Sequence, residues 1–218
     1  VFGEPWLPPV SDGSGSDRAL LRKADEMLRA AGCKRDGNVL KLPNGQPFEI
    51  EFLDSNPALQ PHTQPFQANL KRLGISATSR FVDPAQYQRR LDEFDFDIIT
   101  RALSGSAIPS DTLRVVYGSE AAKTRGSRNQ NGISEPAIDA MIEKIGQARS
   151  YAEAVTAAKC LDRLLRAGRY WIPMWWNDQV WIAHWDMFDR PQTKPKYGSG
   201  APGTWWYDAE KAKRIGKA

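Results

Sequence analysis

Apolar positions in the first hundred residues alternate between helical spacing and strand spacing. Apolar residues at i, i+3 and i+4 predict one face of a helix, and alternating ones predict a half-buried strand. The predicted elements are a helix over 18–31 capped by Ser16, strands over 39–42 and 48–53 joined by a turn at 43–45, a helix over 64–73, a strand over 75–82, a helix opened by Asp83 and Pro84, and a strand over 97–103. The order strand, helix, strand, helix, strand favours right-handed crossovers and a largely parallel sheet.

The second half is less regular. Residues 104–131 are rich in Gly, Ser, Pro, Asn and Arg, which is typical of a long functional loop. Two helices are predicted next, one capped by Ser134 and one over 151–167. Two aromatic runs, 170–176 and 180–185, are predicted as strands because aromatic residues favour β structure. The last thirty residues are rich in Pro and Gly and end in a short charged tail.

The aromatic runs form a belt that one side of a sheet cannot bury. Strand alternation puts Trp171 and Trp175 on one face and Trp176 on the other. The belt could be core, a platform for sugars, or a surface that meets another lobe. We expect an exposed apolar patch over 171–185, facing something outside this chain.

Composition narrows the class of protein. A net charge of +4, with Lys and Arg interspersed among acids, argues against an obligatory nucleic-acid partner. No apolar run is long enough to span a bilayer. Residues 1–16 lack signal-peptide features and read as a Pro-rich segment inside a longer chain. Cys33 and Cys160 lie far apart in sequence, and two free thiols are expected.

The search for catalytic chemistry finds little. His62 and His184 are the only histidines, so a nucleophilic triad lacks a base, and no metal-ligand spacing or phosphate loop occurs. The acids of 92–97 are the best case for a glycoside hydrolase, but they precede a strand, whereas α/β sites gather after strands. We therefore predict no catalytic residue, no metal and no cofactor. A carbohydrate-binding module or hydrolase fragment and a nucleic-acid module stay as alternatives.

Several segments together resemble the C-terminal lobe of the family 5 extracellular solute-binding proteins. They occur in family order: Lys23-Ala24-Asp25-Glu26-Met27-Leu28, Ala31-Gly32, Gly45 through Leu53, Leu70-Lys71-Arg72-Leu73-Gly74-Ile75, Tyr87 through Phe96-Asp97, Asn129-Gln130-Asn131-Gly132-Ile133-Ser134, Ile138-Asp139 and Ile172-Pro173. Within the family, three segments look most like the oligopeptide-binding branch that includes microcin C uptake proteins: Ser127-Arg128-Asn129, Trp185-Asp186-Met187-Phe188 and Lys196-Tyr197-Gly198 with Thr204-Trp205-Trp206.

The resemblance implies an α/β lobe of the type II periplasmic-binding-protein fold, with a mixed, largely parallel sheet flanked by helices. Residues 1–16 would be a linker or a segment returning from an absent N-terminal lobe, 17–169 the C-terminal lobe, and 170–218 strands and a tail crossing back. It implies a non-catalytic protein of the periplasm whose signal peptide has been removed. Its partners would be a peptide-like ligand, its own N-terminal lobe and the membrane permease of an ABC importer.

The predicted ligand site lies where the third strand ends, because ligands meet open α/β sheets at the carboxyl ends of strands. Its members are Arg101, Ser104, Ser106, Asp111, Arg114, Asn129 and Asn131. The two Arg residues could bind carboxylate or phosphate in a bidentate way. The resemblance implies that an acidic residue shortly after this strand pairs with the amino terminus of a peptide, and Asp111 is the candidate.

Overall fold

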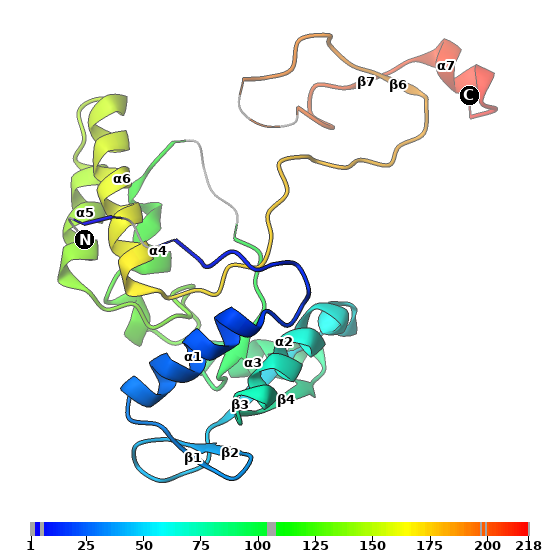
Figure 1. Ribbon diagram of the computed structural model, residues 1–218. Helices are drawn as coiled ribbons and strands as arrows, with labels where there is room; N and C mark the ends of the chain where they lie inside the picture. The colour runs from blue at the N-terminus through cyan, green and yellow to red at the C-terminus, as the bar shows by residue number, and fades with distance from the viewer. Residues whose placement is uncertain (1–2, 5–6, 104–107, 197, 199, 218) are drawn as a thin grey trace. The chain divides into compact units, whose positions relative to one another are not determined.

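The computed structural model describes residues 3–4, 7–103, 108–196, 198 and 200–217 (Figure 1). The chain divides into two units, Val1–Trp171 and Ile172–Ala218, which we call unit 1 and unit 2. Each is described by itself. The division into a linker, a lobe and a returning segment drawn from the sequence stays a prediction.

Unit 1 is built around a parallel sheet. Its strands are β3 (Glu49–Asp54), β4 (Ser76–Phe81) and β5 (Ile98–Ile99), in the order β4-β3-β5. Helix α2 (Gln60–Arg72) connects β3 to β4, and α3 (Pro84–Asp92) connects β4 to β5. The predicted parallel sheet is therefore confirmed, although β5 is shorter than the predicted strand. Because β4 and β5 flank β3, the two connections run in opposite directions and the carboxyl ends of all three strands share one edge.

The cap of α3 follows the sequence prediction. Asp83 Oδ1 accepts hydrogen bonds from the backbone N–H groups of Ala85 and Gln86, and Pro84 is the first helical residue. In two other helices the predicted cap is one residue too early. Asp17, not Ser16, caps α1 (Arg18–Ala30), and its carboxylate accepts from the N–H groups of the first turn. Similarly Glu135, not Ser134, caps α5 (Pro136–Gly146).

The predicted hairpin between 39–42 and 48–53 forms only around its turn, where Leu42 N–H donates to the Gln46 carbonyl and Phe48 N–H donates to the Leu40 carbonyl. Strand β2 (Val39–Lys41) pairs instead with β1 (Lys34–Asp36), and the two antiparallel strands do not extend along 48–53. The reason lies in the sheet, because β4 and β5 take up the hydrogen-bonding groups of β3 on both sides.

One hydrophobic cluster joins this hairpin to the helices. Its buried members are Cys33, Leu40, Leu73 and Ile75, and the apolar stripe of α1 packs against them through Leu21, Ala24 and Leu28. Cys33 is therefore a buried free thiol, whereas Cys160 is free and exposed, which confirms the expectation of two unpaired cysteines.

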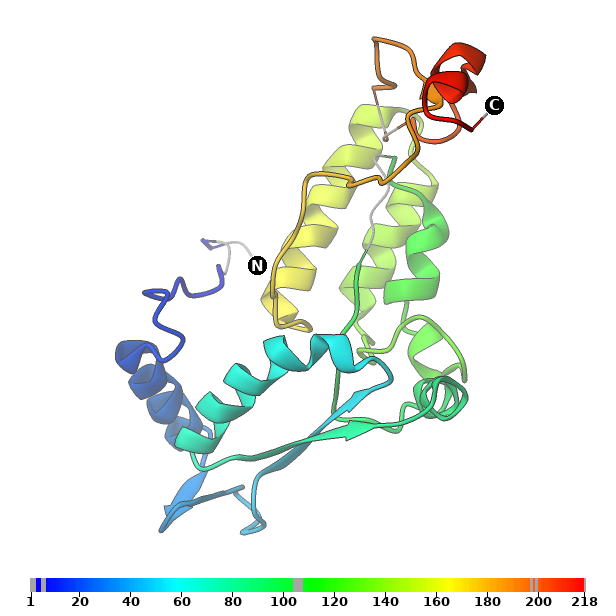
Figure 2. The ribbon, with the colours of Figure 1, turned by 90° about the vertical axis from the view of Figure 1, so that its right-hand side faces the viewer.

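A second cluster lies between α5 and α6 (Tyr151–Gly168), which pack side by side (Figure 2). Ile138, Ile142 and Ile145 of α5 are buried, together with Ala157 and Leu161 of α6. The segment predicted as a long loop contains three short elements: η2 (Asp111–Leu113), α4 (Arg114–Tyr117) and η3 (Ala121–Lys123). Leu113 and Tyr117 pack against this second cluster, so the short elements are part of the folded unit.

The acidic segment 92–97 serves the fold. Arg90 forms ion pairs with Glu51 and Asp95 at 2.8 Å, and the Asp97 carboxylate accepts a hydrogen bond from the Glu51 backbone N–H. Glu93 pairs with Arg125. These bonds support the interpretation of this segment as a connection between helix and strand rather than a pair of catalytic acids.

Unit 2 has little regular structure. Strands β6 (Phe188–Asp189) and β7 (Trp206–Tyr207) pair antiparallel, and α7 (Ala209–Arg214) follows. The two strands predicted within 170–185 are wrong, since no strand among the described residues pairs with this segment. Aromatic composition favours a strand, but a strand forms only where a neighbour takes its N–H and C=O groups.

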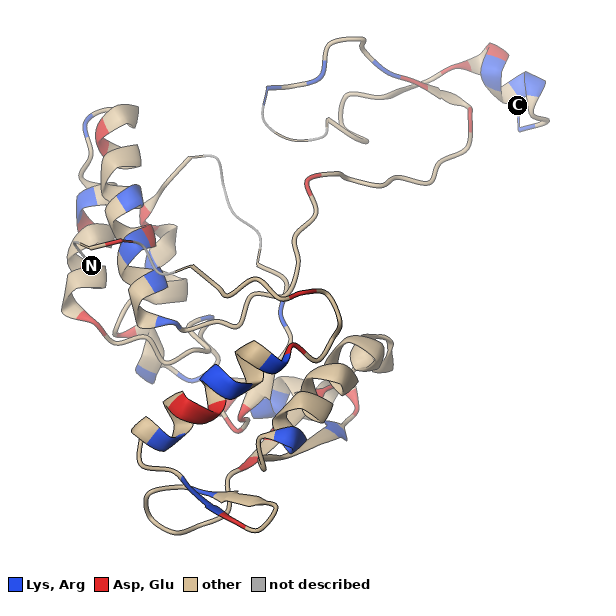
Figure 3. Cartoon of the chain, viewed as in Figure 1, with Lys and Arg blue, Asp and Glu red and all other residues tan. Residues whose placement is uncertain are grey.

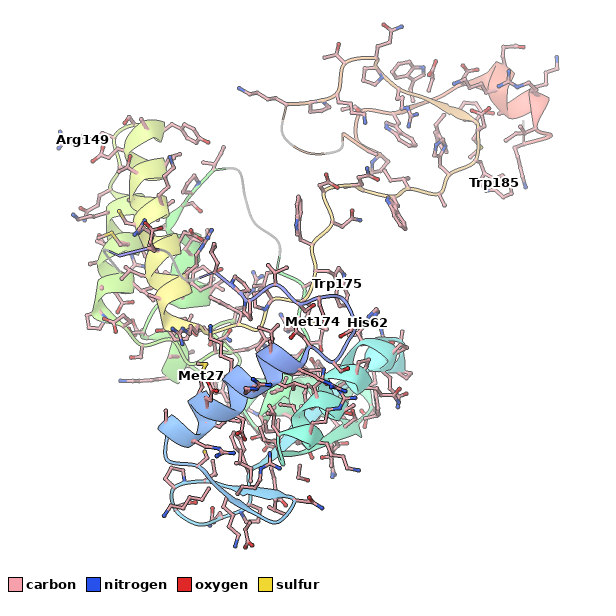
Figure 4. The ribbon with its side chains drawn as sticks, in the orientation of Figure 1. Met27, His62, Arg149, Met174, Trp175 and Trp185 are labelled. Atoms are coloured by element: carbon pink, nitrogen blue, oxygen red, sulfur yellow. The ribbon has the colours of Figure 1, made fainter. Side chains whose placement is uncertain are left out.

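The predicted exposed patch is confirmed for most of its length. Trp176 is 82% exposed and Trp181 is 84% exposed. Trp175 and Trp185, labelled in Figure 4, are also exposed. Trp171 differs, because it is partly buried in unit 1 with its ring 5.7 Å from that of Tyr117. A search of the described helices finds none with the length and hydropathy of a membrane span.

A candidate binding site at the carboxyl edge of the sheet

Three polar side chains lie close enough to influence one another at the carboxyl edge of the parallel sheet. Asp54 is the last residue of β3, Arg101 follows β5, and Tyr87 belongs to α3. Burial raises the pKa of Tyr87, the negative charge of Asp54 raises it further, and the positive charge of Arg101 lowers it. Since Tyr87 senses both charges, the three groups occupy one neighbourhood. We call Asp54, Tyr87 and Arg101 the edge triad.

The backbone fixes the Asp54 carboxylate. Asp54 Oδ1 accepts hydrogen bonds from the N–H groups of Ser55 at 2.7 Å and Asn56 at 2.9 Å. Asn56 in turn caps the short helix η1 (Pro57–Leu59) by accepting from Ala58 N–H. Within the described part of the chain, Asp54 Oδ2 has no partner, so it can accept from a donor outside the protein.

The edge triad offers complementary chemistry. A carboxylate accepts from an ammonium group, a guanidinium donates to a carboxylate in a bidentate way, and a phenol can do either. Arg101 is exposed, whereas Asp54 and Tyr87 are half-buried. The arrangement therefore suits a ligand that carries both positive and negative groups. Among the described residues, His, Cys, Asp and Glu form no cluster of three that could hold a metal ion.

The other predicted site residues have different surroundings. Ser104 and Ser106 lie outside the described residues. Asp111 opens η2 with an exposed side chain. Arg114, on α4, donates to Glu143 of α5 at 2.8 Å, and this hydrogen bond raises the pKa of the guanidinium. The charge of Arg114 is thus already matched within the fold.

Asn129 and Asn131 hold the loop before α5. The Asn129 side chain is 1% exposed; its Nδ2 donates to the carbonyls of Gly118 and Ile133, and its Oδ1 accepts from Ile133 N–H. Asn131 is exposed and donates to the Tyr170 carbonyl. Both amide protons of Asn129 are used inside the protein, which leaves it little capacity for a ligand.

Sequence reasoning found Arg101 but missed Asp54 and Tyr87. The same rule that pointed to the end of the third strand applies to the first, and Asp54 directly follows the apolar run of 48–53. Tyr87 enters the sequence analysis only as part of a family-like segment. Its nearness to two charges depends on how α3 packs beside the ends of β3 and β5, which the sequence does not specify.

The ionisation of Tyr87 provides a direct test of its environment. The folded chain keeps the Tyr87 proton at pH values where the unfolded chain has released it. The free energy of unfolding should therefore fall as pH rises above about 10. In a titration of folded chain followed by tyrosinate absorbance, Tyr87→Phe should remove a component that ionises late. The component of Tyr117, whose pKa burial also raises, should remain. If Tyr87→Phe instead removes a component that ionises at the usual pH for tyrosine, about 10, the described burial of Tyr87 is contradicted.

A family model for the bacterial extracellular solute-binding proteins, family 5 Middle, matches residues 2–124. A protein of Agrobacterium fabrum named "Probable peptide-binding protein YejA" is 37% identical over 207 residues, which cover 94% of this chain and 34% of that protein. A second protein of this organism, named peptidoglycan-binding protein YepA, is 36% identical over 201 residues, which cover 92% of this chain and 32% of that protein. The chain spans about a third of the length of the curated relatives it matches.

Solved structures share the fold at low sequence identity. The oligopeptide-binding protein AppA from Bacillus subtilis, in complex with a nonapeptide, aligns with a TM-score of 0.60 and 17% identity. The alignment covers 68% of this chain and 30% of AppA.

Proposed function

Since the chain belongs to the bacterial extracellular solute-binding proteins of family 5, we propose that it captures a peptide-like solute for an ABC importer. In this proposal the chain supplies one lobe of a two-lobed binding protein that works in the periplasm and delivers its ligand to a membrane permease. Binding, not catalysis, is the role. The names of its relatives support a peptide or a peptide joined to a sugar, since one is named as peptide-binding and another as peptidoglycan-binding.

The edge triad is the observation that carries the proposal. A peptide has an ammonium group at one end and a carboxylate at the other, and Asp54 and Arg101 offer the opposite charges at the edge where ligands of α/β sheets bind. Asp54 Oδ2 would accept from the ammonium group, and Arg101 would donate to a carboxylate. Asp111 and the loop of 101–114 remain part of the proposed site, with Arg114 and Asn129 in mainly structural roles.

Unit 2 has a place in the same proposal. Its segment 172–185 presents tryptophans to solvent and has backbone groups that no described strand takes up. We propose that this segment packs against the other lobe of the binding protein. Burial of large aromatic side chains would stabilise that contact.

The experiment compares ligand affinity among single variants of the full-length protein. Calorimetry with a panel of short peptides, N-acetylated peptides and a muramyl dipeptide would first identify a ligand. Asp54→Asn should then weaken binding of a peptide with a free amino terminus by about tenfold or more, because it removes a charged hydrogen bond. Arg101→Gln should have a similar effect on a ligand with a free carboxylate.

Two controls make this test specific. Asp162→Asn changes an acid on α6 that is already paired with Arg166, and it should leave affinity unchanged. Asp111→Asn tests the alternative partner for the ammonium group. Unchanged affinity in Asp54→Asn, Arg101→Gln and Asp111→Asn would remove this edge from the binding site.

A further inference from the structure

The fold gathers basic side chains at the end of unit 1 opposite the edge triad. They lie on α1, on the β1–β2 hairpin and in the last turn of α2, three elements that adjoin the amino ends of β3 and β4. The cations are Arg18, Arg22, Lys23, Arg29, Lys34, Arg35, Lys41, Lys71 and Arg72. Figure 3 shows Lys and Arg along α1 and the hairpin. We call this set the basic face.

The basic face holds a charge equal to that of the whole chain. Its nine cations lie near five acids, Asp17, Asp25, Glu26, Asp36 and Glu49, which leaves +4, and the whole chain also carries +4. The even distribution of charge along the sequence is therefore not kept in space.

Ion pairs and a hydrogen bond join the elements of this face. Asp25 of α1 lies 2.7 Å from Arg29 and 3.6 Å from Arg35 of the hairpin, and Arg35 donates to the carbonyl of Arg72 in α2. One carboxylate thus lies between two guanidinium groups. All the cations except Lys41 are exposed.

The favourable interaction of cations with helix C-termini accounts for only some of the cations of the basic face. Arg29, Lys71 and Arg72 lie in last turns, where positive charge stabilises a helix. Arg18, Arg22 and Lys23 lie in the first two turns of α1, where positive charge opposes the helix dipole and the first turn holds no acid. In the described structure these three have no ion-pair partner. Met27, one turn after Lys23, is 53% exposed and adds an apolar side chain next to Lys23 (Figure 4).

From this geometry we propose that the basic face holds the protein against the anionic phosphate headgroups of a membrane surface. Exposed cations spread over three elements fit an extended plane of charge better than one small anion. The exposed Met27 beside Lys23 suits the boundary between headgroups and acyl chains. Because the edge triad lies at the opposite end of the sheet, this contact leaves the proposed ligand site open.

Vesicle binding tests this proposal with the 218-residue chain. It should sediment with vesicles that contain about 30% phosphatidylglycerol and not with pure phosphatidylcholine, and about 0.5 M salt should release it. The triple variant Arg18→Glu, Arg22→Glu, Lys23→Glu should lose about tenfold or more of this binding. Glutamates in the first turns favour the helix dipole, so the triple variant should fold at least as well as the parent chain.

A matched variant distinguishes the effect of the basic face from the effect of the chain's total charge. Lys123→Glu, Lys144→Glu and Lys159→Glu reverse three exposed cations elsewhere in unit 1, and they should reduce vesicle binding less than twofold. Equal losses in the two triple variants would overturn the proposal, and so would absence of binding to the anionic vesicles. Tighter binding to poly-glutamate than to vesicles would also overturn it, in favour of an acidic protein partner.

Discussion

Asn129→Ala is expected to lower the free energy of unfolding by about 3–5 kcal/mol, since the variant leaves buried polar groups without partners. The Asn129 side chain makes three hydrogen bonds of 2.8–2.9 Å, two of them to carbonyls and one to a backbone N–H. Gly118 and Ile133, which provide these groups, are themselves buried. Alanine removes all three bonds. Solvent has little access to a site with 1% exposure, so water does not replace them.

The measurement is urea denaturation of the 218-residue chain followed by far-UV circular dichroism. Asn131→Ala is the matched control, because it removes an exposed amide with one recorded hydrogen bond, to Tyr170, and should cost about 1 kcal/mol or less. If Asn129→Ala costs no more than Asn131→Ala, the loop before α5 is not held by this amide. Asn129→Asp should also destabilise strongly, since it places an acceptor or a charge where two donors are needed.

Gly74→Ala is expected to cost about 2–4 kcal/mol. Gly74 ends α2 with φ of +83°, a left-handed conformation that costs an L residue about 1–2 kcal/mol. Its N–H donates to the Lys71 carbonyl and the next N–H, of Ile75, donates to the Leu70 carbonyl, which is the Schellman pattern. A Cβ on Gly74 would lie 2.9 Å from Leu40 N and 3.1 Å from the Asn38 carbonyl oxygen, so backbone would have to move.

Gly132→Ala separates the two causes of this cost. Gly132 also has positive φ, +63°, but a Cβ there would have open space. Gly132→Ala should therefore cost about 1 kcal/mol, the conformational part alone. Equal losses in the two variants, again by urea denaturation, would show that the close approach of Gly74 to β2 has no energetic weight.

Much of the fold of unit 1 follows from local signals. Asp83-Pro84 predicts the start of α3 because the side chain and the ring act within one turn, and the isoleucines of α5 predict their own burial. The caps by Ser16 and Ser134 were each one residue early, because an acid next to each serine competes for the same N–H groups. The family resemblance and the type II periplasmic-binding-protein fold class are confirmed by the comparisons.

Pairing between distant segments was the harder part. The run at 39–42 has a turn on either side of it. It can therefore pair with the segment before it or with the segment after it, and the sequence does not choose between them. The runs within 170–185 have strand composition but no strand partner among the described residues. For the candidate site, the rule on strand ends found Arg101. The nearness of Asp54 and Arg101 depends on the register of Phe52 to Ile98, which the pattern along the chain does not specify.

The division of the aromatic residues between the units has a practical consequence for spectroscopy. Seven of the eight tryptophans occur from Trp171 onward, and six of them belong to unit 2. Intrinsic indole emission of this chain therefore reports mainly on residues 172–218, where several of these rings face solvent. Among the described residues of unit 1, Trp171 alone contributes to this emission, so changes within unit 1 affect a small part of the signal. Changes in unit 1 are better followed with an added fluorescent label. The exposed thiol of Cys160 on α6 gives that label an attachment point.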